Sequence, residues 1–182
     1  MGLNLLVTGR PGVGKTTLME RVLEQLRGSL RLAGFTTAEE RDHSRQRTGF
    51  QILTVEGKQA ELARVGLRST VQVGRYGVNF EAFERLALPE LARRDVDLIV
   101  IDEIGKMECA SERFCEAVRD ALEAPVSVLA TLGNARLPFF LALRARPDVE
   151  VMTLTEHNRN TMVAELCSRL KRLGAQRMPQ AR

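Results

Sequence analysis

Aromatic, histidine and cysteine residues are scarce in this sequence. Its 182 residues include no tryptophan, one tyrosine, two histidines and three cysteines. An aromatic surface on which the bases of a single-stranded nucleic acid could stack is therefore poorly supplied. Cys109, Cys115 and Cys167 cannot all pair with one another, and their spacings match no zinc-binding pattern. We expect free thiols that are buried or half-buried.

Long apolar runs are also missing. No stretch approaches the ~18 consecutive apolar residues of a membrane-spanning helix, so we expect no membrane partner. The first residues carry no basic flank and no small-residue cleavage pattern, which favours a cytoplasmic location. The net charge of +4 suits the binding of polyanionic triphosphates, but it is too diffuse to indicate nucleic-acid binding.

Strand and helix signals alternate along the chain, which predicts an α/β fold with a parallel sheet. A hairpin signal at residues 49–65, inside a charged and irregular region 38–78, predicts a small antiparallel insertion. The length and the hydrophobic content of 44% predict one domain, which we place at residues 1–173 with a loose tail at 174–182. We expect a monomer. The expected strands cover residues 3–8, 34–37, 49–55, 59–65, 72–76, 96–101, 126–130 and 149–154.

Capping residues predict where the helices begin and end. Asn79, Ser111 and Thr155 precede apolar periodic segments and are expected to cap them. Pro89 is expected to end or kink one helix, and Gly174 to end the last. The other expected helices cover residues 16–27 and 136–144, and residues 38–48 are expected to form a charged loop.

The segment from Gly9 to Thr16 has the spacing G-x-x-x-x-G-K-[ST], between an apolar strand and a helix signal. This is the P-loop pattern in its expected context. Glycines let the backbone approach a phosphate, and the successive N–H groups at the helix start favour an anion. Lys15 is expected to reach the β- and γ-phosphates, and Thr16 to bind Mg²⁺. The predicted phosphate-binding residues are Gly9, Arg10, Pro11, Gly12, Val13, Gly14, Lys15, Thr16 and Thr17.

A second candidate segment is the apolar strand that runs into Asp102 and Glu103. The carboxyl ends of parallel strands share one edge of a sheet, so these acids are expected beside the P-loop. Asp102 is predicted to bind Mg²⁺, directly or through water, and Glu103 to orient or deprotonate an attacking water. A base for water favours hydrolysis over phosphotransfer, which must exclude water.

Four further residues are weaker candidates. Thr131, at the end of a strand, is expected either to touch the γ-phosphate or the attacking water, or to cap a turn. Asn158 and Arg159 either lie near the nucleotide base or form an exposed first helical turn. Arg41 lies in the charged loop, and we consider it before Arg159 as an arginine that acts on the triphosphate within the same chain.

Several motifs carry a resemblance over roughly residues 5–171. The segment Ile101–Glu108, which reads IDEIGKME, is the most specific of them, and Asn158-Arg159 belongs to the same set. The chain resembles the thermophilic nucleoside-triphosphatase family, also called the cancer-related nucleoside-triphosphatase family. The remaining motifs lie at residues 34–41, 49–50, 62–65, 73–76 and 83–89.

The resemblance implies a three-layer P-loop fold with an additional strand between the P-loop strand and the Asp-Glu strand. It implies Mg²⁺-dependent hydrolysis of ATP, GTP, CTP and UTP to the diphosphate and phosphate, with low base selectivity and slow turnover. It also implies a second nucleotide-contact segment, formed by Ile101, Asp102, Glu103, Ile104, Gly105, Lys106, Met107 and Glu108.

Two departures from the family pattern concern basic residues. Arg75 stands where lysine is expected, and the loop at residues 133–138 lacks the usual basic residue beside a proline. Two other functions compatible with the P-loop stay open from the sequence alone: a nucleotide or small-molecule kinase, and a nucleotide-gated binding module.

Overall fold

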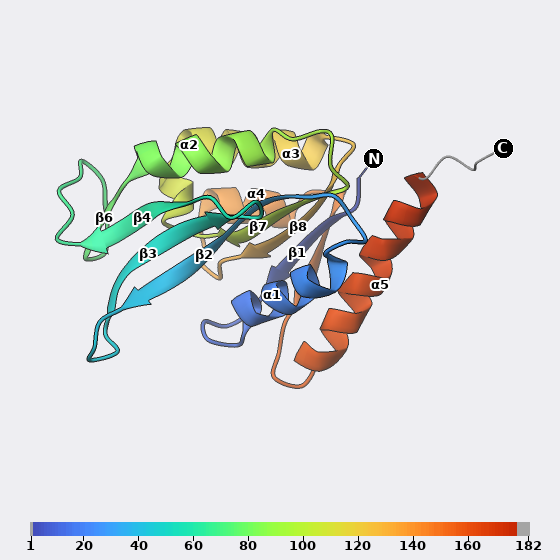
Figure 1. Ribbon diagram of the computed structural model, residues 1–182, viewed down its shortest axis with the longest axis horizontal. Coiled ribbons are helices and arrows are strands. Elements are labelled where there is room, and N and C mark those ends of the chain that lie inside the picture. Colours follow the sequence, from blue (N-terminus) through green and yellow to red (C-terminus); the bar gives the residue numbers. More distant parts are fainter. Residues whose placement is uncertain (1, 178–182) are drawn as a thin grey trace.

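A computed structural model describes residues 2–177 of the chain, with side chains through residue 172. Its strands and helices alternate as the sequence predicts (Figure 1). None of the described helices combines the length and apolar character needed to cross a bilayer. The elements are β1 (Asn4–Thr8), α1 (Lys15–Leu26), β2 (Leu32–Arg41), β3 (Arg47–Thr54), β4 (Gln59–Val65), β5 (Gln72–Val73), β6 (Tyr76–Val78), α2 (Phe80–Leu91), β7 (Leu98–Ile104), the 3-10 helix η1 (Glu108–Ala110), α3 (Glu112–Glu123), β8 (Ser127–Leu132), α4 (Pro138–Arg144), β9 (Val149–Thr153) and α5 (Arg159–Arg177).

The described strands form one sheet in the order β5-β6-β4-β3-β2-β7-β8-β1-β9. From β2 to β9 every neighbouring pair is parallel. Strand β8 lies between β1, which leads into the P-loop segment, and β7, which carries the acids. This is the predicted additional strand, and the parallel arrangement brings the carboxyl ends of β1 and β7 to the same edge of the sheet.

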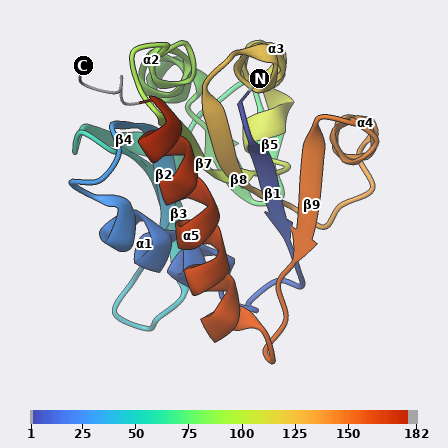
Figure 2. The ribbon, with the colours of Figure 1, turned by 90° about the vertical axis from the view of Figure 1, so that its right-hand side faces the viewer.

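Helices cover both faces of the parallel half, as predicted for a three-layer α/β fold. Helices α1 and α5 lie side by side on one face, and α2, α3 and α4 lie on the other (Figures 1 and 2). The alternation of β7 explains this division. Leu98 and Val100 join the core under α1 and α5, whereas Ile99 and Ile101 join the core under α2 and α3.

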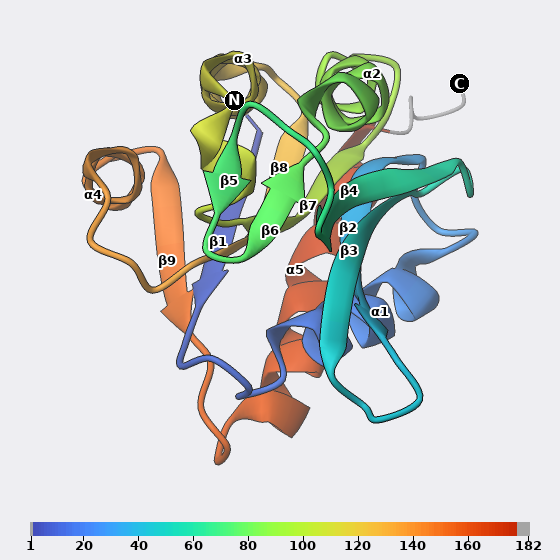
Figure 3. The same ribbon diagram turned by 90° about the vertical axis from the view of Figure 1, so that its left-hand side faces the viewer.

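The antiparallel part is larger than predicted. Strands β3, β4, β6 and β5 extend the sheet beyond β2 as two hairpins (Figure 3). The predicted charged loop at residues 38–48 is too long: β2 continues to Arg41 and β3 begins at Arg47, which leaves a turn at residues 42–46. Backbone pairing, such as Glu39 with Phe50, holds these charged residues in strands. Their side chains remain at least partly exposed, so the charge does not oppose the pairing.

Two of the three predicted helix caps are confirmed in full. The side chain of Asn79 accepts a hydrogen bond from the Ala82 N–H (3.1 Å), and that of Ser111 from the Phe114 N–H (3.1 Å). Thr155 forms a capped turn instead. Its hydroxyl accepts from the Asn158 N–H (3.3 Å), and α5 begins one residue later, at Arg159.

Two helices continue past a residue at which an end, or in the case of Pro89 an end or a kink, was predicted. Helix α2 passes Pro89 and ends at Leu91, because proline removes one N–H donor but the last turn buries Leu91 and Glu90. Helix α5 passes Gly174 and continues to Arg177, the last residue that the structure describes. Glycine weakens a helix by only ~1 kcal/mol, and the preceding turns pack against α1. The part of the predicted tail at residues 178–182 lies outside the described residues.

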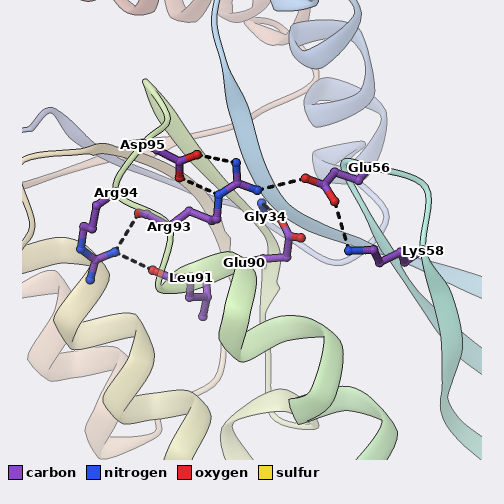
Figure 4. Close-up of polar contacts among 8 residues, drawn as sticks. All are labelled: Gly34, Glu56, Lys58, Glu90, Leu91, Arg93, Arg94 and Asp95. Atoms are coloured by element: carbon purple, nitrogen blue, oxygen red, sulfur yellow. Dashed lines mark hydrogen bonds and ion pairs between the residues drawn. The ribbon is translucent and has the colours of Figure 1, made fainter.

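Polar contacts join α2 to β2 and to the β3–β4 turn (Figure 4). The buried carboxylate of Glu90 accepts a hydrogen bond from the backbone N–H of Gly34 (2.9 Å). Arg93, just after α2, donates to Asp95 (2.7 Å) and to Glu56 in the β3–β4 turn (3.0 Å). The first of these contacts fixes the place of α2 against the sheet from inside the molecule.

Candidate active site

The P-loop segment turns sharply between β1 and α1. Gly12 and Gly14 have φ values of 78° and 102°, which side-chain-bearing residues rarely adopt. A Cβ atom on Gly9 would lie 2.8 Å from the Leu154 carbonyl oxygen, so the loop passes close to the β9–α5 connection. The buried side chain of Val13 anchors the loop in the core under α1 and α5. The backbone is thus free to face an anion.

Lys15 connects the loop to the acids of β7. Its Nζ atom lies 3.8 Å from Glu103 Oε2 and 3.5 Å from the Gly9 carbonyl oxygen, and its side chain is 10% exposed. The two predicted segments therefore meet at the carboxyl edge of the sheet. The strand itself continues through the acids to Ile104, further than the predicted end at Ile101.

Asp102 is fully buried and only partly satisfied. Its Oδ1 accepts a hydrogen bond from the Thr131 hydroxyl (2.5 Å), and its Oδ2 has no hydrogen-bond partner among the described residues. Burial raises the pKa of Asp102, against the hydroxyls of Thr131 and Thr16, which lower it. A buried carboxylate oxygen without a partner, beside a threonine hydroxyl, fits a divalent cation bound directly or through water.

Glu103 is more accessible, with 34% of its side chain exposed. Burial raises the pKa of Glu103, and the Lys15 ammonium lowers it. A Cβ atom on either Gly105 or Gly133 would lie 3.2 Å from Glu103 Oε1, so two glycines leave room around this carboxylate. A carboxyl group with a raised pKa beside open space is suited to accept a proton from water.

Most other side chains of the segment Ile101–Glu108 point away from the carboxyl edge of the sheet, where Lys15 meets Glu103. The side chains of Ile101 and Ile104 belong to the core under α2 and α3, and Met107 packs against that core. Glu108 is 6% exposed, and burial raises its pKa to about 8. Its Oε2 lies 2.5 Å from the position of a Cβ atom on Gly105, so it supports the turn from inside. Lys106 is exposed.

The structure shows the contacts that Thr131 and Arg41 make within the protein. Thr131 is fully buried and donates to Asp102, so it orients that carboxylate. Arg41 forms an ion pair with Glu39 and donates to the Arg45 carbonyl oxygen (2.9 Å), all within the β2–β3 hairpin. Arg75 also stays in the antiparallel part, where its guanidinium lies 5.3 Å from the centre of the Tyr76 ring.

Asn158 and Arg159 follow β9 beside the P-loop. The Asn158 amide donates to the Thr153 carbonyl oxygen (2.9 Å) and accepts from the Thr155 N–H (2.7 Å), so it shapes the turn. Arg159 instead faces a cavity of about 380 Å³ between α1 and α5. Arg21, one helical turn after Thr17, also lines this cavity, and no motif in the sequence indicated it. The lining residues are Gly14, Thr17, Leu18, Arg21, Arg159, Asn160 and Val163.

Comparisons with known proteins agree with this geometry. Residues 4–167 match the family described as "NTPase". A nucleoside-triphosphatase THEP1 from Thermotoga sp. (strain RQ2) is 40% identical, over 93% of this chain and 96% of the relative. The cancer-related nucleoside-triphosphatase of Homo sapiens is 38% identical, over 91% and 95% of the two chains. The crystal structure of THEP1 from Aquifex aeolicus aligns with a TM-score of 0.80 at 38% identity, covering 92% of this chain and 98% of that one.

The family match spans the P-loop segment, both acids of β7 and the start of α5. The similar structure covers nearly the whole chain at an identity well above the level at which only a fold is shared. The matched region therefore includes Lys15 and Glu103, which meet at one edge of the sheet. On this evidence the chain belongs to the NTPase family.

Proposed function

We propose that this protein hydrolyses nucleoside triphosphates to the diphosphate and phosphate, with Mg²⁺, broad base specificity and slow turnover. The observation that carries the proposal is the 3.8 Å approach of Lys15 Nζ to Glu103 Oε2. It brings the expected phosphate-binding cation and a candidate base into contact at one edge of the sheet. The names of the relatives, which describe nucleoside-triphosphatases, support the same activity.

Thr16 and Asp102 would hold the Mg²⁺ ion. The unpartnered Oδ2 of Asp102 supports this assignment. No group of three or more histidine, cysteine, aspartate or glutamate residues is placed to hold a metal within the described part of the chain. That fits an ion that shares its coordination between one carboxylate and the substrate phosphates. When bound, Mg²⁺ would neutralise charge on the phosphate oxygens.

The remaining steps of hydrolysis are assigned to groups of the protein. Glu103 orients a water and takes its proton as the water oxygen bonds to the γ-phosphorus. The bond between that phosphorus and the β–γ bridging oxygen breaks, which releases the diphosphate. Lys15 and the backbone N–H groups of Gly12–Thr16 stabilise the charge on the transferring group. The nucleoside extends into the cavity lined by Arg159 and Arg21, whose planar guanidinium groups suit stacking on any base.

The decisive variant is Glu103→Gln. Removing the proton acceptor while keeping its shape should lower phosphate release from ATP, GTP, CTP and UTP by about 10²–10⁴-fold. Affinity for a non-hydrolysable ATP analogue, measured by titration calorimetry, should stay within about threefold. Lys15→Ala should abolish both phosphate release and binding of the analogue. The matched control is Glu112→Gln, the same chemical change at an exposed position of α3.

The same assay separates the alternatives. Phosphate release that survives Glu103→Gln unchanged would remove Glu103 from its role. A kinase would consume ATP faster when an acceptor is added than with water alone. A nucleotide-gated binding module would capture a partner only with the non-hydrolysable analogue.

A further inference from the structure

An arginine that no sequence motif singled out has its guanidinium at the edge of the sheet where the P-loop and the acids meet. Arg144 is the last residue of α4, the short helix beside β9 (Figures 2 and 3). Its Nη2 atom donates to the carbonyl oxygen of Gly133 (3.2 Å) and to the hydroxyl of Thr8 (3.4 Å). The guanidinium of Arg144 thus extends from α4 to the carboxyl ends of β1 and β8.

The two residues that Arg144 contacts, Thr8 and Gly133, lie next to the ion pair of Lys15 with Glu103. Thr8 precedes Gly9, whose carbonyl oxygen is 3.5 Å from Lys15 Nζ. Gly133 adjoins Glu103, since a Cβ atom on Gly133 would lie 3.2 Å from Glu103 Oε1. The guanidinium therefore contacts the two residues, Thr8 and Gly133, through which the chain adjoins the ion pair of Lys15 with Glu103.

Arg144 has no carboxylate partner among the residues whose side chains are described. Both of its acceptors are neutral, and it is half-buried. Arg146, two residues later, shows the contrast: it donates to Asp148 (2.8 Å) and pairs with Glu123 (3.4 Å). Arg144 thus keeps an uncompensated charge at the site. Arg41, the candidate suggested by the sequence, is occupied within its own hairpin.

We propose that Arg144 is a catalytic residue that contacts the terminal phosphoryl group in the same chain and stabilises the charge that develops there during hydrolysis. This inference rests on the proposed function. Arginines in this role contribute mainly to turnover, because their contact with the phosphoryl oxygens strengthens in the transition state. The five donors of a guanidinium allow Arg144 to bind a phosphoryl oxygen while it keeps its contact with Gly133.

The test compares Arg144→Gln, Arg144→Ala and the control Arg146→Ala. Glutamine keeps a donor for Gly133 but removes the charge. We expect Arg144→Gln to lower kcat for ATP by about 10²-fold or more, with KM changed by less than about threefold and an unchanged thermal unfolding midpoint. Guanidinium at low millimolar concentration should restore part of the activity of Arg144→Ala. Arg146→Ala should keep the wild-type kcat.

Two results would overturn the inference. Full activity in Arg144→Gln would mean that Arg144 only attaches α4 to the sheet. A loss of activity that follows a loss of folded protein in both variants would mean the same. A wild-type chain that releases no phosphate would instead refute the proposed function. In that case, the affinities of the wild type and of Arg144→Gln for ATP and ADP would test the contact. Losing a contact with the terminal phosphate must reduce the ratio of ATP affinity to ADP affinity.

Discussion

Three carboxyl groups within seven residues of chain have different surroundings. Asp102 is fully buried with one oxygen unpartnered, Glu103 is partly exposed beside Lys15, and Glu108 is buried behind Gly105. Burial raises the pKa of each, to about 8 for Glu108. Burial and neighbours, rather than residue type, distinguish them, and on the proposed function they would bind the metal, accept a proton and support the turn, respectively.

The protonation of Glu108 makes stability depend on pH. Its pKa is raised from the usual 4.5 to about 8, so its contribution to stability is complete below the lower value and is lost as pH rises through the upper one. We expect Glu108→Gln, which stays neutral, to lose less stability between pH 5 and pH 9 than the wild type, by at least about 1.4 kcal/mol, one pKa unit.

Urea unfolding in buffer containing a chelator measures this difference. The exposed-site variant Glu112→Gln should follow the wild type across the same pH range. Equal pH dependence in Glu108→Gln and the wild type would show that Glu108 does not titrate in this window.

At the scale of elements, one buried contact sets α2 against β2. Gly34 has a φ of 112°, and a Cβ atom there would lie 1.9 Å from the Val100 carbonyl oxygen, so β2 approaches β7 too closely for a side chain. Its backbone N–H points into the interior and is satisfied by Glu90 (2.9 Å). A helix residue therefore completes the hydrogen bonding of a strand.

This contact predicts different effects for two substitutions of Glu90. Glu90→Leu leaves the buried Gly34 N–H without an acceptor and should cost about 1–3 kcal/mol of unfolding free energy. Glu90→Gln keeps a carbonyl oxygen at the same place and should cost less than half as much. Urea unfolding at neutral pH measures both. Equal losses would mean that the contact with Gly34 contributes little.

At the scale of the whole molecule, the antiparallel part shares its core with the parallel part. Ile52 of β3 and Leu62 of β4 are fully buried in the same cluster as Phe83 of α2 and Ile101 of β7. The two hairpins therefore complete the hydrophobic core and are not a separate appendage. Because the same core cluster includes the hairpins and the parallel strands, the two parts should unfold in one transition.

Neighbouring residues of β3 provide the test. Ile52 is fully buried and Leu53 is 39% exposed. Ile52→Ala should lower the unfolding free energy by about 2–5 kcal/mol, and Leu53→Ala by less than about 1 kcal/mol. The fluorescence of Tyr76, the only tyrosine, reports on β6, and circular dichroism reports on the whole chain. Both signals should shift together; separate transitions would mean that the hairpins unfold alone.

Local chemistry made several features predictable. The spacing from Gly9 to Thr16 requires a turn of one kind, and Asn79 and Ser111 cap helices through contacts with residues three positions away. Features that depend on distant pairing were predicted wrongly. Strands β2 and β3 pair with each other up to Arg41 and Arg47, inside the predicted loop, and α5, which packs against α1, stays helical past Gly174.

The sequence by itself determined the P-loop turn, the order of most strands and helices, and the position of Asp102 and Glu103 at the end of an apolar strand, because each depends on residues close together in the chain. Tertiary structure alone decided what surrounds them. It buried Glu108, paired Thr131 with Asp102, opened a cavity beside Arg21 and Arg159, and placed Arg144 next to Gly133 and Thr8. The physical reason is that burial and charge environment arise between elements far apart in the chain, and no local pattern of residues specifies them.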